Sequence, residues 1–298
     1  MTRSRTARWA ISLLTPLAAM ALAATPAAAA TDDEPAFGSY VALGDSYAAG
    51  PLIPLQIGLP PGCLRSNQNY PSKVARVLGI TDFRDVSCSG ATTDDLVGSQ
   101  SVSLGVNAPQ LDTLGPDTAL VTMTMGGNDI GFASIIEECA KRSPLHPLGT
   151  ACKDFYTSGG SDQLSARVDA TAPKIAAALG AIEKRSPHAK VVLVGYPTIL
   201  PDTGPGCFPV VPFSAGDVAY LRGVEKELNA MLAEQADEAG VQYVDTYAPT
   251  VGHDVCTLPG TKWIEGLVPT SPAAPVHPNE LGMTAIAKAV TTDLALSR

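Results

Sequence analysis

The chain has 298 residues, 45% of them hydrophobic and 16% charged, and its 29 acidic and 20 basic residues give a formal net charge of −9. A chain of this size can bury one substantial core, and its negative charge disfavours nucleic acid as a partner. The charge also argues against simple electrostatic docking on anionic lipid, although an acidic enzyme can still act on neutral or dispersed lipids.

Residues 1–30 are typical of a secretory signal peptide. Three arginines precede an apolar run over residues 9–24, and small residues follow as far as Ala30. The run is too short and too rich in alanine for a stable bilayer span, and no later segment offers about twenty apolar residues in a row. Cleavage after Ala30 leaves 17 basic and 29 acidic residues and a formal charge of −12. We expect a secreted, extracellular protein without a transmembrane anchor, in which residues 31–298 form a single domain.

Apolar runs in the first half of the chain predict strands that deliver polar residues to turns. Residues 40–43 stop at Gly44 and place Ser46 at a strand end. Residues 119–125 stop at a pair of glycines and place Asn128 just beyond a strand. Between these strands the pattern predicts, in order, a helix over 70–78, a strand over 83–86 and a short helix over 93–97.

The second half of the chain alternates helices with strands. Residues 130–157 contain cysteines and prolines without a sustained period, which indicates an excursion tied by a disulfide. The elements expected after it are a helix over 162–184, interrupted or kinked near Pro173, a strand over 191–194, a proline-rich loop over 207–213, a helix over 214–239, a strand over 241–245 and a helix over 279–296 capped by Asn279. This alternation predicts an α/β fold with a parallel sheet covered on both faces. Such sheets bind ligands beyond the carboxyl ends of their strands.

Six cysteines in an exported chain indicate disulfides, because the outside of the cell is oxidising. Fifteen pairings are formally possible. Sequence neighbourhood favours three pairs that each close a loop containing proline or glycine, namely Cys63 with Cys88, Cys139 with Cys152, and Cys207 with Cys256. The chain has no metal-binding cysteine or histidine spacing, no phosphate-binding loop and no dinucleotide glycine pattern, so we expect no metal and no cofactor.

Four short segments carry the residue types that an ester-cleaving site needs. They are, in chain order, Gly44-Asp45-Ser46-Tyr47, Ser89-Gly90-Ala91-Thr92, Gly126-Gly127-Asn128-Asp129 and Val276-His277-Pro278. Acyl transfer requires a hydroxyl nucleophile, an imidazole that takes its proton, and fixed donors for the oxyanion that develops on the carbonyl. Ser46, His277, and the pair Gly90 and Asn128 fit these roles.

Each of these residues also has an ordinary interpretation as part of a turn. Gly, Asp and Ser are common turn formers, and Gly90 and Asn128 are equally suited to turns after strands. Chance occurrence of all four segments in one chain is much rarer than chance occurrence of any one of them. The competing serine-hydrolase layout carries a Gly-x-Ser-x-Gly elbow, which does not occur in this chain.

Four histidines are candidates for the base. His146 and His188 are most simply exposed loop residues, because both lie beside prolines between predicted elements. His253, next to Asp254, is the rival to His277. We rank His277 first because it immediately precedes a helix cap and can be held rigidly over the sheet edge.

In these four segments and their order the chain resembles the SGNH (GDSL-type) hydrolase superfamily, which is named for its Ser, Gly, Asn and His. The resemblance extends to the branch of secreted actinobacterial lipases and esterases through residues 40–47, 69–71, 88–91, 126–129 and 253–254. It implies a three-layer α/β/α flavodoxin-like sandwich, no metal, and three local disulfides paired as above. It also implies Ser46 as nucleophile, His277 as base, and an oxyanion hole made by the Ser46 N–H, the Gly90 N–H and the Asn128 side-chain amide.

One position departs from the pattern of the family. Many members place an aspartate three residues before the catalytic histidine, where this chain has Ala274. Some members of the secreted branch use a main-chain carbonyl there, which can fix the imidazole tautomer but brings no negative charge. We therefore expect a dyad of Ser46 and His277 supported by the Ala274 carbonyl, with Asp254 as the alternative third member.

The sequence predicts a serine ester hydrolase that acts as a monomer on a small-molecule or lipid ester. The resemblance favours fatty-acyl esters, and hence a lipase, a phospholipase or a simple esterase. A carbohydrate O-deacetylase on the same fold and a non-catalytic secreted binding module are the alternatives. The apolar loop over residues 51–55, with Ile57 and Leu59, fits either an acyl groove or packing on the core.

Overall fold

A five-stranded parallel sheet forms the centre of the fold. The computed structural model describes residue 2 and residues 37–296, so the predicted signal peptide lies outside the described residues apart from residue 2. The strands of the sheet are β1 (Ser39–Gly44), β4 (Asp82–Asp85), β7 (Leu120–Thr124), β8 (Lys190–Val194) and β9 (Gln242–Val244). Their order is β4-β1-β7-β8-β9, and every neighbouring pair is parallel. This is the 2-1-3-4-5 order of flavodoxin-like sheets, and it confirms the predicted α/β sandwich.

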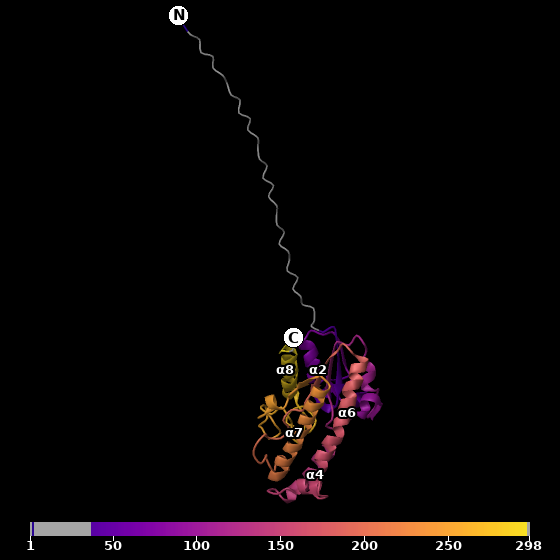
Figure 1. The fold of residues 1–298 in the computed structure, drawn as a ribbon. Helices are drawn as coiled ribbons and strands as arrows, with labels where there is room; N and C mark the ends of the chain where they lie inside the picture. The colour runs from indigo at the N-terminus through magenta and orange to yellow at the C-terminus, as the bar shows by residue number, and fades with distance from the viewer. Residues whose placement is uncertain (1, 3–36, 297–298) are drawn as a thin grey trace. The chain divides into compact units, whose positions relative to one another are not determined.

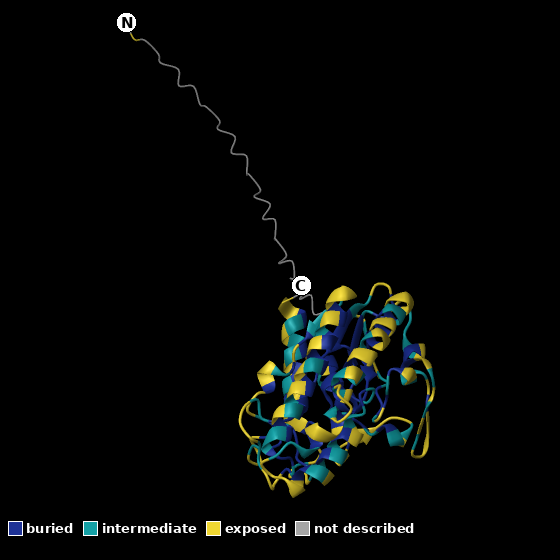
Figure 2. Cartoon of the chain, turned by 60° about the horizontal axis from the view of Figure 1, so that its bottom comes forward, coloured by how far each residue is buried: buried dark blue, intermediate teal, exposed yellow. Residues whose placement is uncertain are grey.

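Two pairs of helices cover the two faces of this sheet (Figure 1). On one face α2 (Tyr70–Val77) packs beside α8 (Glu280–Leu296), and on the other α6 (Gln163–Arg185) packs beside α7 (Ala215–Glu238). Alternate residues of β1 belong to the two cores, because Tyr40 and Ala42 pack with α2 and α8 whereas Val41 and Leu43 pack on the side of α6 and α7. Burial on both faces explains why the strand is a continuous apolar run. Figure 2 shows the buried strands in dark blue between helices whose outer turns are yellow.

The remaining elements occupy the connections between the strands and these covering helices. The other α-helices are α1 (Ser46–Ala49), α3 (Asp94–Val97), α4 (Phe132–Arg142) and α5 (Ala151–Thr157). Strands β2 (Gln56–Ile57) and β3 (Arg65–Ser66) form one antiparallel pair, and β5 (Gln100–Val102) and β6 (Gly105–Asn107) form another. The 3₁₀ helices are η1 (Pro61–Cys63), η2 (Gln110–Thr113), η3 (Ser143–Leu145) and η4 (Ala248–Thr250).

The strands of the sheet and its covering helices occur within one residue of their predicted bounds, but two segments differ in detail from what the sequence indicated. The segment 130–157 is largely helical, because α4 and α5 lie in it. Only Ile135 and Cys139 of the 11 residues of α4 are fully buried, so its apolar period is too sparse to stand out in the sequence. Helix α6 is not interrupted at Pro173. That proline is exposed, so its missing hydrogen bond faces water while the buried side of the helix stays packed.

Three disulfides tie the connections to one another. They join Cys63 with Cys88, Cys139 with Cys152, and Cys207 with Cys256, the same pairs that sequence neighbourhood favours. The second links α4 to α5, and the third links the loop before α7 to the loop after β9. Within residues 37–296, none of the helices is both long enough and apolar enough to pass through a membrane.

Candidate active site

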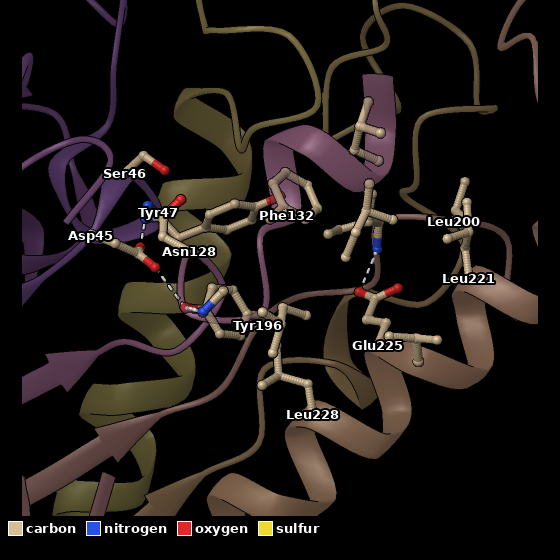
Figure 3. A pocket seen from close by; sticks show the side chains of 16 residues that line it. Asp45, Ser46, Tyr47, Asn128, Phe132, Tyr196, Leu200, Leu221, Glu225 and Leu228 are labelled. Carbon is tan, nitrogen blue, oxygen red and sulfur yellow. Dashed lines mark hydrogen bonds between the residues drawn. The ribbon is translucent and has the colours of Figure 1, made fainter. Parts of the chain in front are cut away.

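Residues from two neighbouring strands and from one distant loop meet at the carboxyl edge of the sheet. Ser46 follows β1 and Asn128 follows β7, which are adjacent strands, whereas His277 lies in the loop before α8. The order of the strands reverses between β1 and β7, and parallel sheets bind ligands at such a point. Ser46 and Asn128 line the same cavity (Figure 3).

The turn that carries Ser46 requires a glycine at its start. Gly44 has a φ of +151°, and a Cβ at this position would lie 2.7 Å from Ala48 Cβ and 2.8 Å from the Thr124 carbonyl oxygen. Gln110 holds both main-chain groups of this glycine, because Gly44 N–H donates to Oε1 at 2.8 Å and Nε2 donates to the Gly44 carbonyl at 2.9 Å. The backbone that leads into Ser46 is therefore fixed from both sides.

Asp45 links the turn that carries Ser46 to the turn after β7. Its Oδ1 accepts the Tyr47 N–H at 2.8 Å, which caps α1, and its Oδ2 accepts the Tyr196 hydroxyl at 2.6 Å. The Tyr196 oxygen in turn accepts the Gly127 N–H at 2.7 Å. Burial raises the pKa of Asp45 to about 7, against the opposing hydrogen bond from Tyr196. These contacts hold the residue before Asn128 at a fixed place relative to Ser46 (Figure 3).

The imidazole of His277 lies within hydrogen-bonding distance of the Ser46 hydroxyl. His277 Nε2 is 2.8 Å from Ser46 Oγ, and Nδ1 is 2.7 Å from the Pro275 carbonyl oxygen. When Nδ1–H donates to that carbonyl, the lone pair of Nε2 faces the serine proton. Burial lowers the pKa of His277 below its ordinary 6.5, and the Pro275 carbonyl opposes this shift. The imidazole is therefore neutral at pH 7, as a general base must be.

The carbonyl that contacts the imidazole belongs to Pro275, and the prediction of Ala274 was wrong. The Ala274 carbonyl accepts the main-chain N–H of His277 at 3.2 Å, so it closes the turn instead of contacting the ring. Asp254, the alternative third member, accepts the Cys256 N–H at 2.9 Å. No hydrogen bond or ion pair joins Asp254 to His277 in the part of the chain that the structure describes.

The backbone just before His277 adopts a left-handed conformation that is rare for its residue type. Val276 has a φ of +61°, which is strained for a β-branched side chain. The Tyr47 hydroxyl donates to the Val276 carbonyl at 2.7 Å, and the Tyr47 ring lies against the imidazole with 4.9 Å between the ring centroids. Sequence reasoning assigned Tyr47 no role, although its place directly after Ser46 in the first segment was the available signal.

Glu265 anchors the histidine loop from within the protein, and sequence reasoning missed it. Its side chain is fully buried, and its Oε1 accepts the Asn279 side-chain amide at 2.8 Å while Oε2 accepts the Thr270 N–H at 2.6 Å. Its main-chain N–H donates to the His277 carbonyl at 2.9 Å. Burial by itself would raise the pKa of Glu265, but the hydrogen bonds from Asn279 and Thr270 hold it below 4.5.

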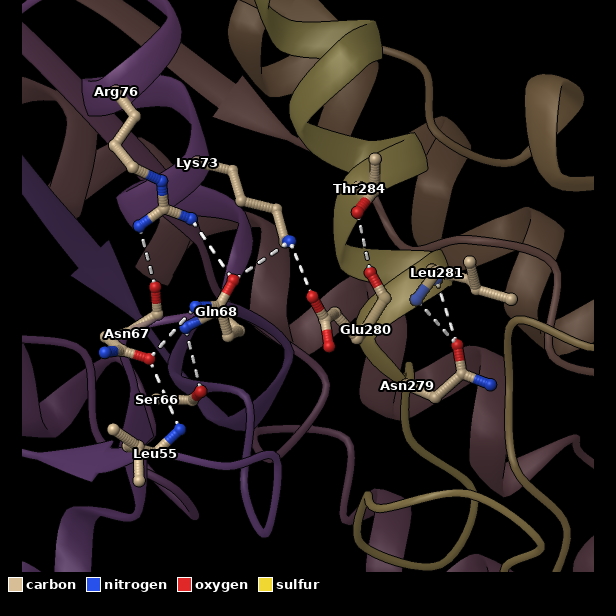
Figure 4. A network of polar contacts seen from close by, with 11 residues as sticks. Leu55, Ser66, Asn67, Gln68, Lys73, Arg76, Asn279, Glu280, Leu281 and Thr284 are labelled. Carbon is tan, nitrogen blue, oxygen red and sulfur yellow. Dashed lines mark hydrogen bonds and ion pairs between the residues drawn. The ribbon is translucent and has the colours of Figure 1, made fainter.

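The loop ends at a well-capped helix, as the sequence predicted. Asn279 Oδ1 accepts the N–H groups of Leu281 and Gly282 at 3.0 and 3.1 Å, the first of which is drawn in Figure 4. One residue later Glu280 pairs with Lys73 of α2 at 3.4 Å (Figure 4). The cap fixes where α8 begins, and His277 lies two residues before that cap.

Two of the three predicted oxyanion donors, Asn128 and Gly90, are placed differently. Asn128 Nδ2 donates to the Ala91 carbonyl at 2.8 Å, which fixes the amide and leaves its second N–H free to donate. Gly90 has a φ of +81° and is exposed in the loop beside Ala91. Its N–H makes no hydrogen bond within residues 37–296, and it does not line the cavity that holds Ser46 and Asn128.

The other three histidines lie elsewhere. His146 and His188 are exposed, as expected. His253 stacks on Trp263 with 3.5 Å between the ring centroids, and its Nδ1 is 2.6 Å from the Thr261 carbonyl oxygen. Among the described residues, no group of three or more His, Cys, Asp or Glu side chains is arranged to hold a metal ion.

An apolar cavity extends from Ser46 toward α7 (Figure 3). Its apolar walls come from the start of α4, the segment after β8 and the first half of α7: Ile130, Phe132, Ile135, Ile136, Ile199, Leu200, Leu221, Val224 and Leu228. The loop over residues 51–55 contributes nothing to this cavity, because Ile53 is buried in the other core while Leu52 and Leu55 are exposed. The cavity walls thus come partly from the segment 130–157, which the sequence singled out, and partly from the segment after β8 and from α7, which it did not.

Comparison with known proteins finds similarity along most of the chain. The model of the GDSL-like Lipase/Acylhydrolase family matches residues 42–285. Lipase 2 of Streptomyces coelicolor is 42% identical over 250 residues, which cover 82% of this chain and 81% of that protein. The crystal structure of phospholipase A1 from Streptomyces albidoflavus has a TM-score of 0.73 and 27% identity, covering 87% of this chain and 100% of the other. An extracellular lipase from Streptomyces rimosus has a TM-score of 0.71 and 28% identity, covering 86% and 99%.

Proposed function

The chain belongs to the GDSL-like lipase/acylhydrolase family and is a carboxylic ester hydrolase, and we propose that it cleaves fatty-acyl esters through an acyl-enzyme on Ser46. The observation that carries this proposal is the approach of His277 Nε2 to Ser46 Oγ at 2.8 Å. A serine hydroxyl is a poor nucleophile until a base accepts its proton, and His277 is positioned to accept it.

In the first half of the reaction, His277 takes the proton of Ser46 as Oγ attacks the ester carbonyl carbon. The charge that develops on the carbonyl oxygen is stabilised by the free N–H of the Asn128 amide and by the main-chain N–H groups of Ser46 and Gly90. The tetrahedral intermediate then expels the alcohol, which receives the proton from His277. In the second half, His277 deprotonates a water molecule that attacks the acyl-enzyme, and Ser46 leaves with the proton.

The imidazolium that forms between these steps has a carbonyl partner instead of a carboxylate. The Pro275 oxygen, 2.7 Å from Nδ1, orients the ring and offers a dipole but no full charge. Orientation therefore depends on the backbone of the histidine loop, which Tyr47 and Glu265 hold through their contacts with the main chain of Val276 and His277.

We place the acyl chain of the substrate in the apolar cavity that begins at Ser46. Its walls are suited to a hydrocarbon chain, and relatives of this chain bear the names lipase and phospholipase A1. We further propose that residues 1–30 are removed on export and that residues 31–298 act as one domain outside the cell. The three disulfides and the extracellular relative support this location.

Covalent labelling tests the nucleophile directly. A fluorophosphonate probe should modify the peptide that contains Ser46, as found by mass spectrometry, and Ser46→Ala should take up no probe while keeping its thermal midpoint. Wild-type enzyme should hydrolyse medium-chain nitrophenyl esters in preference to acetyl-xylan. Labelling of a different serine, or turnover by Ser46→Ala, would disprove the proposal.

A further inference from the structure

The apolar cavity contains a carboxyl group that ester cleavage does not use. Glu225 of α7 lines this cavity among Leu221, Val224 and Leu228, and the residue is only 8% exposed. Figure 3 shows Ser46 and the Glu225 carboxyl group at well-separated places on the lining. A chain that enters at Ser46 and follows the apolar walls therefore runs toward Glu225.

The two oxygens of this carboxyl group have different surroundings. Oε1 accepts the Ile199 N–H at 2.9 Å, which holds the segment after β8 against α7. Oε2 is buried and makes no hydrogen bond within the described residues. Buried polar atoms in folded proteins are nearly always paired, so an unpaired oxygen on the lining of a binding cavity indicates a partner that the ligand supplies.

The protonation state of the carboxyl group decides which chemical groups can pair with it. Burial raises the pKa of Glu225 to about 8, against the opposing hydrogen bond from the Ile199 N–H. No lysine, arginine or histidine lines the cavity, so the group is neutralised by a proton instead of an ion pair. At pH 7 it is mostly a neutral acid, which offers one O–H donor together with an acceptor.

We propose that Glu225 makes this enzyme selective for esters whose acyl chain carries a hydroxyl or oxo group at the carbon that reaches its carboxyl group. The inference rests on the proposed function of Ser46 and His277 and on placing the acyl chain in this cavity. An oxygen on the chain accepts the Glu225 O–H, and a hydroxyl can also donate to its carbonyl oxygen. An unsubstituted chain displaces water from the cavity but leaves Oε2 without a hydrogen-bond partner. Selectivity therefore arises mainly from the cost of this unpaired oxygen when the plain acyl chain is bound.

A series of esters with a single leaving group tests this in the unmodified enzyme. The series consists of the nitrophenyl ester of one medium-chain acid and of its derivatives with a single hydroxyl at each successive carbon. We expect one position to raise kcat/KM by about tenfold or more over the plain ester, the amount that one buried hydrogen bond contributes. A hydroxyl at any other position should lower kcat/KM, because a hydroxyl against an apolar wall loses its hydrogen bonds to water and gains no partner. If no position exceeds the plain ester, the selectivity is disproved, whereas hydrolysis of the plain ester and labelling of Ser46 would still support the proposed function.

Variants of Glu225 assign the selectivity to this side chain. Glu225→Met should bring the kcat/KM ratio of the preferred hydroxy ester to the plain ester close to unity. Glu225→Gln keeps a donor and an acceptor and should retain part of the preference. Glu234→Met is the matched control, because Glu234 is exposed on the same helix and does not line the cavity. A preference that persists in folded Glu225→Met overturns the inference. If that variant does not fold, a reduced preference in Glu225→Gln supports the inference, while an unchanged ratio overturns it.

Discussion

The two halves of the proposed catalytic site are held in place by different parts of the fold. Ser46 and Asn128 each follow a strand of the sheet by a few residues, so their positions depend on main-chain pairing between β1 and β7. His277 lies in a connection between η4 and α8 that contains no strand and no helix, and buried side chains hold it. The first half should therefore depend on the sheet and on the turns that follow its strands, whereas the second should depend on polar contacts to a loop without regular structure.

The largest effect should come from removing the base. His277→Ala should lower kcat by on the order of ten-thousandfold, because Ser46 then has no partner that accepts its proton. Steady-state hydrolysis of a nitrophenyl ester measures this. His253→Ala is the matched control, since that ring stacks on Trp263 away from Ser46, and it should leave kcat close to that of the unmodified enzyme. A greater loss from His253→Ala than from His277→Ala would reverse the assignment.

A smaller loss of kcat is expected when Asn128, at the end of the sheet, is changed. Asn128→Ala should lower kcat by about a hundredfold to a thousandfold, because one donor to the oxyanion is lost while the others remain. The thermal midpoint should change little, since the side chain has one hydrogen bond, to the Ala91 carbonyl. Asn67→Ala removes a comparable amide outside the cavity and should leave kcat unchanged. Full activity of Asn128→Ala would mean that this amide does not face the reacting carbonyl.

The same contrast explains what could be predicted from the sequence. Apolar runs that end at glycines mark strand ends, and parallel pairing then brings those ends to one edge, so Ser46 and Asn128 could be placed together without coordinates. His277 was identified by its residue type and by the helix cap that follows it. Its partner could not be identified, because the choice between the Ala274 and Pro275 carbonyls depends on the left-handed backbone at Val276, which no sequence pattern indicates.

The sequence drew attention to the segment 130–157, but the complete set of cavity walls was beyond sequence reasoning for a related reason. The start of α4, the segment after β8 and the middle of α7 are far apart in the chain, and no local pattern shows that they face one cavity. Glu225 in particular lies on a helix that carries six acidic residues, three of which are solvent-exposed. Only packing distinguishes a carboxyl group on the lining of an apolar cavity from one in water.

Stability should depend on pH in opposite ways in the two halves. Hydrogen bonds hold the pKa of Glu265 below 4.5, so its stabilisation is fully present above that pH and is lost as the pH falls through the folded-state pKa. Glu265→Gln should therefore lower the free energy of unfolding by about 2 kcal/mol at pH 7 and by less in acid. Urea unfolding at several pH values measures the difference.

Asp45→Asn is the counterpart on the side of the sheet. Burial raises the pKa of Asp45 from 3.8 to about 7, so the folded protein holds a proton that the unfolded chain has released, and its stability falls as the pH rises through this range. The asparagine variant lacks this dependence, and its stability relative to the unmodified enzyme should improve as the pH rises. Parallel pH profiles for the two variants would contradict the contrast between the two halves.

The smallest effect should come from one hydroxyl group that joins the two halves. Tyr47→Phe keeps the ring against the imidazole but removes the donor to the Val276 carbonyl, so kcat should fall by roughly tenfold with little change in KM. Tyr40→Phe loses a comparable buried hydrogen bond, to Thr122 in the other core, and should lose stability without losing turnover.

The pH profile of activity separates a positioning role of Tyr47 from a role in stability. In the unmodified enzyme kcat/KM should fall only as the pH drops through the lowered pKa of His277, below 6.5, whereas in Tyr47→Phe a looser and wetter loop should move this midpoint back toward 6.5. A midpoint that stays in place, with equal losses of activity in both tyrosine variants, would show that Tyr47 acts only through folding and that the histidine loop holds its own position.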